Sequence, residues 1–156
     1  MPVVFSRVEE RLIHGQITCA WAKNINFDAF AVVDDLVASD AFMIGLLEMS
    51  VPNKKKLYVF KEEDACKKIA EKKEKLFLLA KSPVTFSRLI RDGLHIDRLN
   101  IGSVHFKPGK KEIYKTVYLS AEEIQALKEI LGEGIPCDIQ KLPTEPKKDV
   151  AELLFR

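Results

Sequence analysis

The chain has 156 residues, of which 47% are hydrophobic and 31% charged, with only 7 Gly and 7 Pro. Such a chain typically forms one globular domain, and at this length folding buries roughly 70% of the unfolded chain's surface. The 25 basic and 23 acidic residues are too evenly balanced to indicate nucleic-acid binding. We therefore expect a single domain over residues 1–156 and no nucleic-acid partner.

The chain contains no long apolar segment. The longest apolar runs, 29–33 and 76–80, have five residues each, far fewer than the roughly 20 that a membrane-spanning helix requires. The first residues reach charge at Arg7 without the apolar core of a signal peptide. Three cysteines without Cys-x-x-Cys spacing argue against a disulfide framework or a zinc site. These features predict a cytoplasmic protein with reduced cysteines.

Short runs of Val, Ile, Leu and Phe alternate with segments of helical periodicity. In chain order we predict a strand at 2–8, a helix at 15–23, a strand at 27–33, a helix at 37–49, a strand at 56–60, a helix at 62–75, a strand at 76–80, a helix at 83–93, strands at 98–101 and 113–119, a helix at 121–131, a strand at 137–142 and a helix at 150–155. This alternation predicts an α/β fold: an open, mostly parallel sheet of about seven strands with helices on both faces.

Local signals support several helices. Pro83 is suited to a first helical turn, and Ser120 with Glu123 three residues later forms a capping box. The helix at 37–49 is expected to bury an apolar face, made of Phe42, Leu46, Leu47 and Met49. The segment at 103–112 contains Pro and Gly and predicts an irregular loop.

Charge is concentrated in the turn after the first predicted strand, which reads Arg-Val-Glu-Glu-Arg-Leu-Ile-His-Gly-Gln over 7–16. In open α/β sheets, functional groups collect at this carboxyl edge. The start of a helix disfavours a charged imidazolium and favours an anion attached to the ring. His14 therefore suits a nucleophile that carries a phosphoryl group, and arginine suits its oxygens. A helix cap with ordinary solvated turn charges is the alternative interpretation.

The 7–16 stretch resembles the signature of the IIB components of the mannose/fructose/sorbose class of bacterial phosphoenolpyruvate-dependent sugar phosphotransferase systems. That signature typically reads Arg-x-Asp-Asp-Arg-Leu-Ile-His-Gly-Gln. Other segments resemble the family in the same order, at 32–35, 78–81, 99–102, 105–111 and 119–123. The resemblance spans nearly the whole chain. It departs from the usual pattern at Glu9 and Glu10, where aspartates are typical.

The resemblance implies a cytoplasmic phosphocarrier, peripherally associated with a membrane transporter complex. Its histidine, at the position of His14, receives a phosphoryl group on Nδ1 from a phosphohistidine of the IIA component. It then passes the group to a sugar entering through the membrane components IIC and IID. The longer acids at Glu9 and Glu10 leave a second interpretation open, a regulatory interaction module of the same fold that has lost phosphoryl transfer. No cofactor and no metal are expected, because the phosphoryl group arrives on a nitrogen leaving group.

We assign roles around His14 as hypotheses. The site residues are Arg11 and Arg7 as phosphate clamps, Glu9 as the carboxylate that orients an arginine or the imidazole, Gly15 as a point of close backbone approach, and Gln16 as a donor at the helix end. Asp34 is expected at the edge of the His14 pocket, with Asp35 capping the next helix.

Other candidates lie outside this turn. His105 either lines the pocket, touches a partner, or is an ordinary loop residue. Lys107, Lys110 and Lys111 beside Phe106 suggest a docking site for an acidic IIA surface. A receiver-like domain is disfavoured because the acidic pair at 34–35 follows the wrong strand, and a nucleotide-binding module because no glycine-rich phosphate motif is present. The sequence does not identify the sugar, and it is compatible with a homo-oligomer.

Overall fold

The computed structural model describes residues 2–52 and 55–155, without the side chain of Gln16. In chain order the elements are β1 (Val3–Val8), α1 (Gly15–Asn24), β2 (Ala29–Val33), α2 (Asp35–Ala38), α3 (Ala41–Ser50), β3 (Lys56–Phe60), α4 (Glu62–Ala70), β4 (Leu76–Ala80), α5 (Pro83–Arg91), β5 (Leu99–Ile101), β6 (Lys111–Tyr114), β7 (Val117–Leu119), α6 (Ala121–Gly132), β8 (Cys137–Ile139), β9 (Lys148–Asp149) and α7 (Val150–Leu154).

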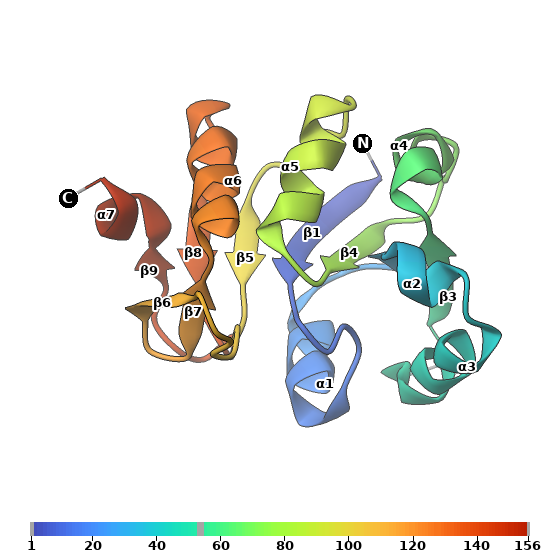
Figure 1. The fold of residues 1–156 in the computed structure, drawn as a ribbon. Coiled ribbons are helices and arrows are strands. Elements are labelled where there is room, and N and C mark those ends of the chain that lie inside the picture. The colour runs from blue at the N-terminus through green and yellow to red at the C-terminus, as the bar shows by residue number, and fades with distance from the viewer. Residues whose placement is uncertain (1, 53–54, 156) are drawn as a thin grey trace.

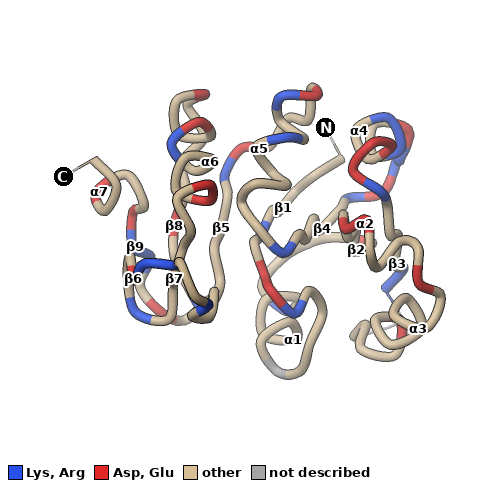
Figure 2. The backbone as a smooth tube through the Cα atoms, viewed as in Figure 1, with Lys and Arg blue, Asp and Glu red and all other residues tan. Residues whose placement is uncertain are grey.

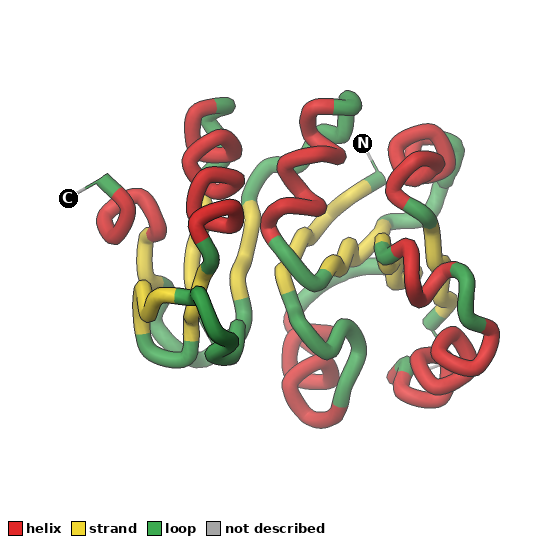
Figure 3. Tube along the Cα trace, in the orientation of Figure 1, coloured by secondary structure: helices red, strands yellow, loops and turns green. Residues whose placement is uncertain are grey.

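One seven-stranded sheet organises the chain, in the order β3-β2-β4-β1-β5-β8-β9 (Figure 1). Its strands pair in parallel except β9, which is antiparallel to β8. Helices α1 and α3 lie in the lower half of the view, whereas α4, α5 and α6 lie in the upper half (Figure 3). The predicted α/β class, with a mostly parallel sheet of about seven strands, is confirmed.

The core consists of two apolar layers, one on each face of the sheet. Strands β2 and β4 are buried along their whole length, as expected for central parallel strands covered on both sides. One layer packs the sheet against α4, α5, α6 and α7, and the other packs it against α1 and α3. On the second face, Phe5 stacks on Trp21 of α1 with ring centroids 5.2 Å apart. This contact packs helix α1 against β1 on that face of the sheet.

The single strand predicted at 113–119 is wrong. Residues 111–119 form a separate antiparallel hairpin, β6–β7, whose turn places Thr116 at φ 60°. Polar Lys115 and Thr116 interrupt the apolar run and supply this turn. The seventh strand of the main sheet is instead β9, whose two residues are too few to show any periodicity.

The helix predicted at 37–49 is also wrong, because the chain breaks at Ser39 and Asp40 into α2 and α3. The Asp40 carboxylate caps α3 by accepting the N–H groups of Phe42 and Met43 at 3.0 and 3.2 Å. The break changes the phase of the helix. Of the four apolar side chains expected inside, only Leu47 is buried, while the others are exposed: Phe42 by 73%, Leu46 by 43% and Met49 by 85%.

Other boundaries agree more closely with the sequence. Helix α5 begins at Pro83, but α4 ends at Ala70 instead of continuing to 75. The capping box is present, since Ser120 and Glu123 exchange two hydrogen bonds of 3.1 Å. Within the described ranges, no helix has the length and apolar character needed to cross a bilayer.

The capping box also holds a lysine. Lys110 Nζ lies 2.9 Å from Glu123 Oε1, and its side chain is only 13% exposed. Burial raises the pKa of Glu123, but bonds from Lys110 and from the backbone of Ser120 outweigh this effect and leave the pKa below its usual value. Lys110 therefore ties the loop before β6 to the start of α6.

Candidate functional site

The turn after β1 is held rigidly at the carboxyl edge of the sheet. The Glu9 N–H donates to the carbonyl of Ala80 on β4 at 2.9 Å, and the Leu12 N–H donates to the carbonyl of Glu9 at 3.0 Å. Leu12 is buried and has φ 58°, a left-handed conformation that non-glycine residues keep only when their surroundings enforce it. The turn therefore presents the residue that follows it, His14, in one fixed position.

His14 is the N-cap residue of α1. Its backbone N–H donates to Thr18 Oγ1 at 2.8 Å, while among the described side chains none caps the helix and no acidic residue lies in its first turn. The N–H groups of that turn are therefore open to an anion, and the helix dipole favours one. Gly15 has a φ of 45°, a left-handed conformation that favours glycine, although a Cβ there would meet no atom within 4 Å. The close approach of the Gly15 backbone to a phosphoryl group stays a prediction.

Glu9 connects His14 to Arg7. One carboxylate oxygen, Oε1, accepts from Arg7 Nε at 3.0 Å, and the other, Oε2, lies 3.2 Å from His14 Nε2. A carboxylate can only accept, so a neutral imidazole in this contact carries its proton on Nε2. Nδ1 makes no hydrogen bond to a described residue and keeps its lone pair. The ring is 14% exposed, and its free nitrogen is the nucleophilic one.

Arg7 lies inside the protein. Its guanidinium donates to Asn100 Oδ1 and to the backbone carbonyls of Gln140 and Lys141, at 2.7 and 3.0 Å for the carbonyls. It also stacks 4.7 Å from the ring centre of Trp21. Burial lowers the pKa of Arg7, and the Glu9 carboxylate offsets part of this effect. With 1% exposure, Arg7 is placed to hold Glu9, and it is not accessible to a phosphoryl group.

Gly102, at the end of β5, makes room for this ion pair. A Cβ on Gly102 would lie 2.6 Å from Arg7 Nη2 and 2.7 Å from Glu9 Oε1. Sequence reasoning did not identify Gly102, Asn100 or Gln140 as supports of the site. The available signal was a glycine directly after the strand that pairs with β1.

The other residues predicted for the turn are less enclosed. The side chain of Arg11 is exposed and has no ion pair or hydrogen bond to another described residue. It is therefore free to contact an incoming phosphoryl group. The predicted role of the Gln16 side chain lies outside the described part of the structure.

Glu10 joins this turn to the loop after β5. Its Oε1 accepts the backbone N–H of His105 at 2.7 Å and lies 2.7 Å from His105 Nδ1. His105 is thus connected to the His14 turn through Glu10, with its ring mostly exposed. Phe106 beside it packs edge-on against Tyr118 of β7, with ring centroids 5.7 Å apart.

The three lysines of this loop do not form one surface. Lys107 and Lys111 are exposed, whereas Lys110 pairs with Glu123. Figure 2 shows basic stretches on and beside the β6–β7 hairpin, next to the end of β5. We use the name basic group for three exposed side chains, Arg11 of the His14 turn and Lys107 and Lys111 after β5; Lys110 is not one of them.

Asp34 lies at the same edge of the sheet, after β2. Its Oδ2 accepts the Val37 N–H at 3.0 Å and lies 3.8 Å from Lys81 Nζ. Asp34 therefore caps α2, a role expected of Asp35, which instead accepts the Glu62 N–H at 2.8 Å. Among the described residues, no group of three or more His, Cys, Asp or Glu side chains is arranged to hold a metal ion.

Comparison with known proteins gives one consistent result. The family described as "PTS system sorbose subfamily IIB component" matches residues 3–156. The chain is 33% identical over 154 residues to the N-acetylgalactosamine-specific phosphotransferase enzyme IIB component 2 of Escherichia coli (strain K12), covering 97% of this chain and 98% of that protein. It is also 33% identical over 156 residues to the sorbose-specific EIIB component of Lacticaseibacillus casei, covering 96% and 93%.

A solved structure agrees along the whole chain. The IIBSor domain of the sorbose permease from Klebsiella pneumoniae superimposes with a TM-score of 0.92 at 30% sequence identity. The match covers 99% of this chain and 97% of that domain.

The first prediction concerns the space at Gly102. We expect Gly102→Ala to displace the enclosed Arg7–Glu9 pair and to lower the free energy of unfolding by about 1–3 kcal/mol, the usual cost of overpacking. Urea denaturation measures this change. Gly132→Ala is the matched control, because a Cβ there meets no atom within 4 Å. Equal stabilities of the two variants would contradict the role assigned to Gly102.

Proposed function

Since the chain belongs to the sorbose-subfamily IIB components of the phosphotransferase system, we propose that His14 is its phosphoryl carrier and that Nδ1 is the phosphorylated atom. IIB components of this class accept a phosphoryl group from IIA and pass it to a sugar, and this phosphotransferase activity is that of the chain. The observation that supports the assignment is the Glu9–His14 contact, which occupies Nε2 and leaves Nδ1 free.

The proposed chemistry consists of two phosphoryl transfers. The Nδ1 lone pair of His14 attacks the phosphorus of the IIA phosphohistidine, and the breaking P–N bond returns its electron pair to the IIA imidazole. A sugar hydroxyl then attacks the same phosphorus and gives its proton to water, while the breaking P–N bond returns its electron pair to Nδ1 of His14. Positioning and charge stabilisation supply most of the rate in such reactions. The open N–H groups of α1 serve this purpose here.

We assign three supporting roles. Glu9 holds the Nε2–H of the ring and stabilises the positive charge that develops there when Nδ1 is phosphorylated. Arg11 is the phosphate clamp, because it is exposed and has no partner among the described residues. Arg7 is a positioning residue that acts through Glu9. Since Glu9 reaches both partners despite replacing the usual aspartate, the longer side chain gives no support to a regulatory module without transfer.

The two phosphoryl transfers indicate the partner proteins. IIB components work between IIA and a sugar permease. We propose that the permease here consists of IIC and IID components, that the chain works on the cytoplasmic side and associates peripherally with them, and that IIA docks on the exposed basic group of Arg11, Lys107 and Lys111.

The second prediction tests the carrier. Incubated with phosphoenolpyruvate and the upstream phosphotransferase proteins including IIA, the protein should gain one acid-labile, base-stable phosphoryl group. We expect His14→Ala to abolish it completely, because the sequence has no other histidine at the start of α1. His95→Ala and His105→Ala are the matched controls and should keep it. A His14→Ala protein that still becomes labelled would exclude the proposal.

The third prediction tests Glu9. Glu9→Gln keeps the size of the side chain but removes the charge that orients the ring. A hydrogen bond to a charged group contributes about 1.5–3 kcal/mol, so we expect phosphorylation of His14 to slow by about 10- to 100-fold. Rapid-quench kinetics with phosphorylated IIA would measure this rate, and nitrogen NMR of the His14 ring would show a weakened preference for the Nε2–H tautomer. An unchanged tautomer and rate would refute the orienting role.

The fourth prediction concerns IIA docking. The double variant Lys107→Glu and Lys111→Glu should slow phosphorylation by IIA about 10-fold at low salt, with a smaller difference at high salt, because steering by exposed charges is screened. Lys110 is left unchanged because it pairs with Glu123.

The control for docking replaces two other exposed lysines by glutamate, Lys67 on α4 and Lys73 after it. Their reversal changes the net charge equally and should leave the rate within about 2-fold, because the effect depends on where the charges lie. If both double variants slow the reaction equally, the basic group is not the docking site.

A further inference from the structure

The apolar face of α2 and α3 is a surface feature that the proposed site does not explain. Five large apolar side chains are exposed there: Met43 by 37% and Leu36 by 79%, together with Phe42, Leu46 and Met49. The last three are spaced i, i+4 and i+7, so they share one side of α3. A helix that is apolar on nearly all sides is normally buried. Of the described side chains of α3, only Leu47 is fully buried in this protein.

The charged residues within the α2–α3 segment have one sign, and the lysine that pairs with one of them, Lys81, comes from the end of β4. Residues 34–50 contain four acids, Asp34, Asp35, Asp40 and Glu48, and no lysine or arginine. In Figure 2 the α2–α3 segment is tan interrupted only by red. The exposed face, which we call the α3 face, is therefore an apolar stripe bordered by carboxylates. Its complement is an apolar surface bordered by basic side chains.

Two occupants fit this charge poorly. A second copy of the chain would bring the same acids together, because a twofold contact uses the same surface on both copies. A lipid surface of the cytoplasmic leaflet is anionic and attracts basic segments, whereas the α3 face has none. The cytoplasmic loops of membrane proteins, in contrast, carry an excess of lysine and arginine.

The position of the face relates it to His14. Helix α2 begins at the carboxyl end of β2, the same edge at which His14 follows β1. Only β4 separates the two strands, so their backbones lie about 10 Å apart. The β6–β7 hairpin follows β5, on the other side of β1 (Figure 1). The basic group and the α3 face therefore flank His14 on opposite sides.

We infer that the α3 face docks the protein onto the basic, apolar cytoplasmic surface of the sugar permease. This inference rests on the proposed function, in which His14 must meet two proteins in turn. IIA would approach over the basic group and the permease over the α3 face, and both would reach His14. Opposite charge on the two flanks directs each partner to its own side.

The fifth prediction uses the triple variant Phe42→Ser, Leu46→Ser and Met49→Ser. Phosphorylated protein is sedimented with inverted membrane vesicles that contain the cognate IIC and IID components. We expect binding to weaken at least about 10-fold, because buried apolar anchors carry most of the affinity of an interface. Phosphorylation of His14 by IIA should stay within about 2-fold. Glu48→Lys should also weaken binding, and more at low salt.

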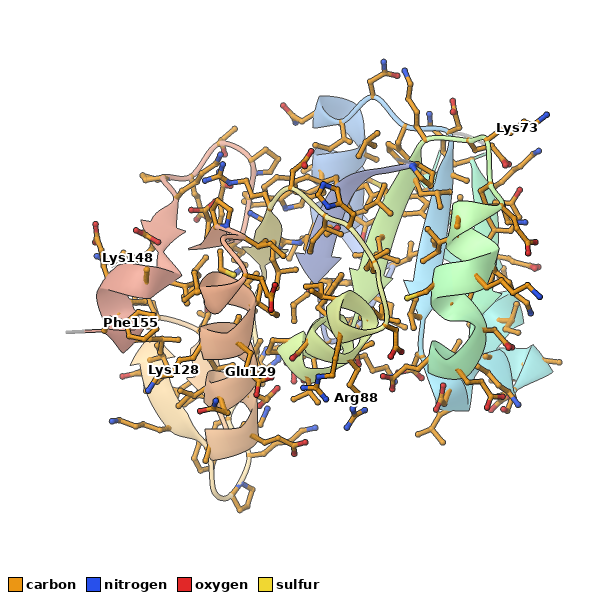
Figure 4. The ribbon with its side chains drawn as sticks, turned by 90° about the horizontal axis from the view of Figure 1, so that it is seen from above. Lys73, Arg88, Lys128, Glu129, Lys148 and Phe155 are labelled. Atoms are coloured by element: carbon orange, nitrogen blue, oxygen red, sulfur yellow. The ribbon has the colours of Figure 1, made fainter. Side chains whose placement is uncertain are left out.

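The matched control is Phe155→Ser, which removes another exposed aromatic side chain and should bind like the wild type. Figure 4 labels Phe155 on the far side of the molecule, beside Lys128, 5.8 Å from its ring. Circular dichroism and the IIA reaction show whether the triple variant folds. If it does not, the single variants Phe42→Ser and Met49→Ser provide the test, because both side chains are largely exposed.

Three results would overturn the inference. The triple variant could sediment like the wild type. The wild type could sediment equally with vesicles of the same lipids that lack IIC and IID, which would indicate a lipid surface. The wild type could instead form a dimer that the triple variant loses, which would indicate a second copy. Failure of the proposed function is seen separately, as a wild-type protein that IIA does not phosphorylate at His14.

Discussion

The ion pair between Arg7 and Glu9 is the interaction on which the site depends. A buried guanidinium is costly unless it is paired and hydrogen-bonded, and here backbone carbonyls after β8, Asn100 of β5 and the Trp21 ring of α1 all contribute. The pair thus connects strands β1, β5 and β8 with helix α1. As a result, the Glu9 carboxylate is held in a position where its second oxygen contacts His14.

The residues that position His14 are thus different from those that we propose contact the phosphoryl group. Arg7 and Glu9, which fix the imidazole, are buried, whereas Arg11 is exposed and no described side chain caps the start of α1. Arg11, the start of α1 and Nδ1 of His14 are the groups that we propose meet the phosphoryl group. Electrostatic stabilisation works best when its groups are already in place before charge moves. Leu12 of the same turn is left-handed and buried, a conformation that a non-glycine residue keeps when its surroundings enforce it.

A phosphocarrier must also exchange partners quickly, and the surface around His14 is divided accordingly. Glu10 ties the loop of His105, on the basic side of the site, to the His14 turn. The opposite side, beyond β4, is apolar and acidic. Two partners that differ in charge can then use the same histidine without competing for the same contacts.

The sequence alone determined the α/β class, most of the strands, and the turn that holds His14, because apolar periodicity and a charged strand-to-helix junction are local properties. It also singled out Glu9. Only the tertiary structure decided that Arg7 is enclosed, that Lys110 pairs with Glu123, and that the apolar stripe of α3 faces outward. These outcomes depend on which segments meet in space: Gly102 beside Arg7, α6 beside the loop, and a helix break at Asp40 that turned an apparent core face toward solvent.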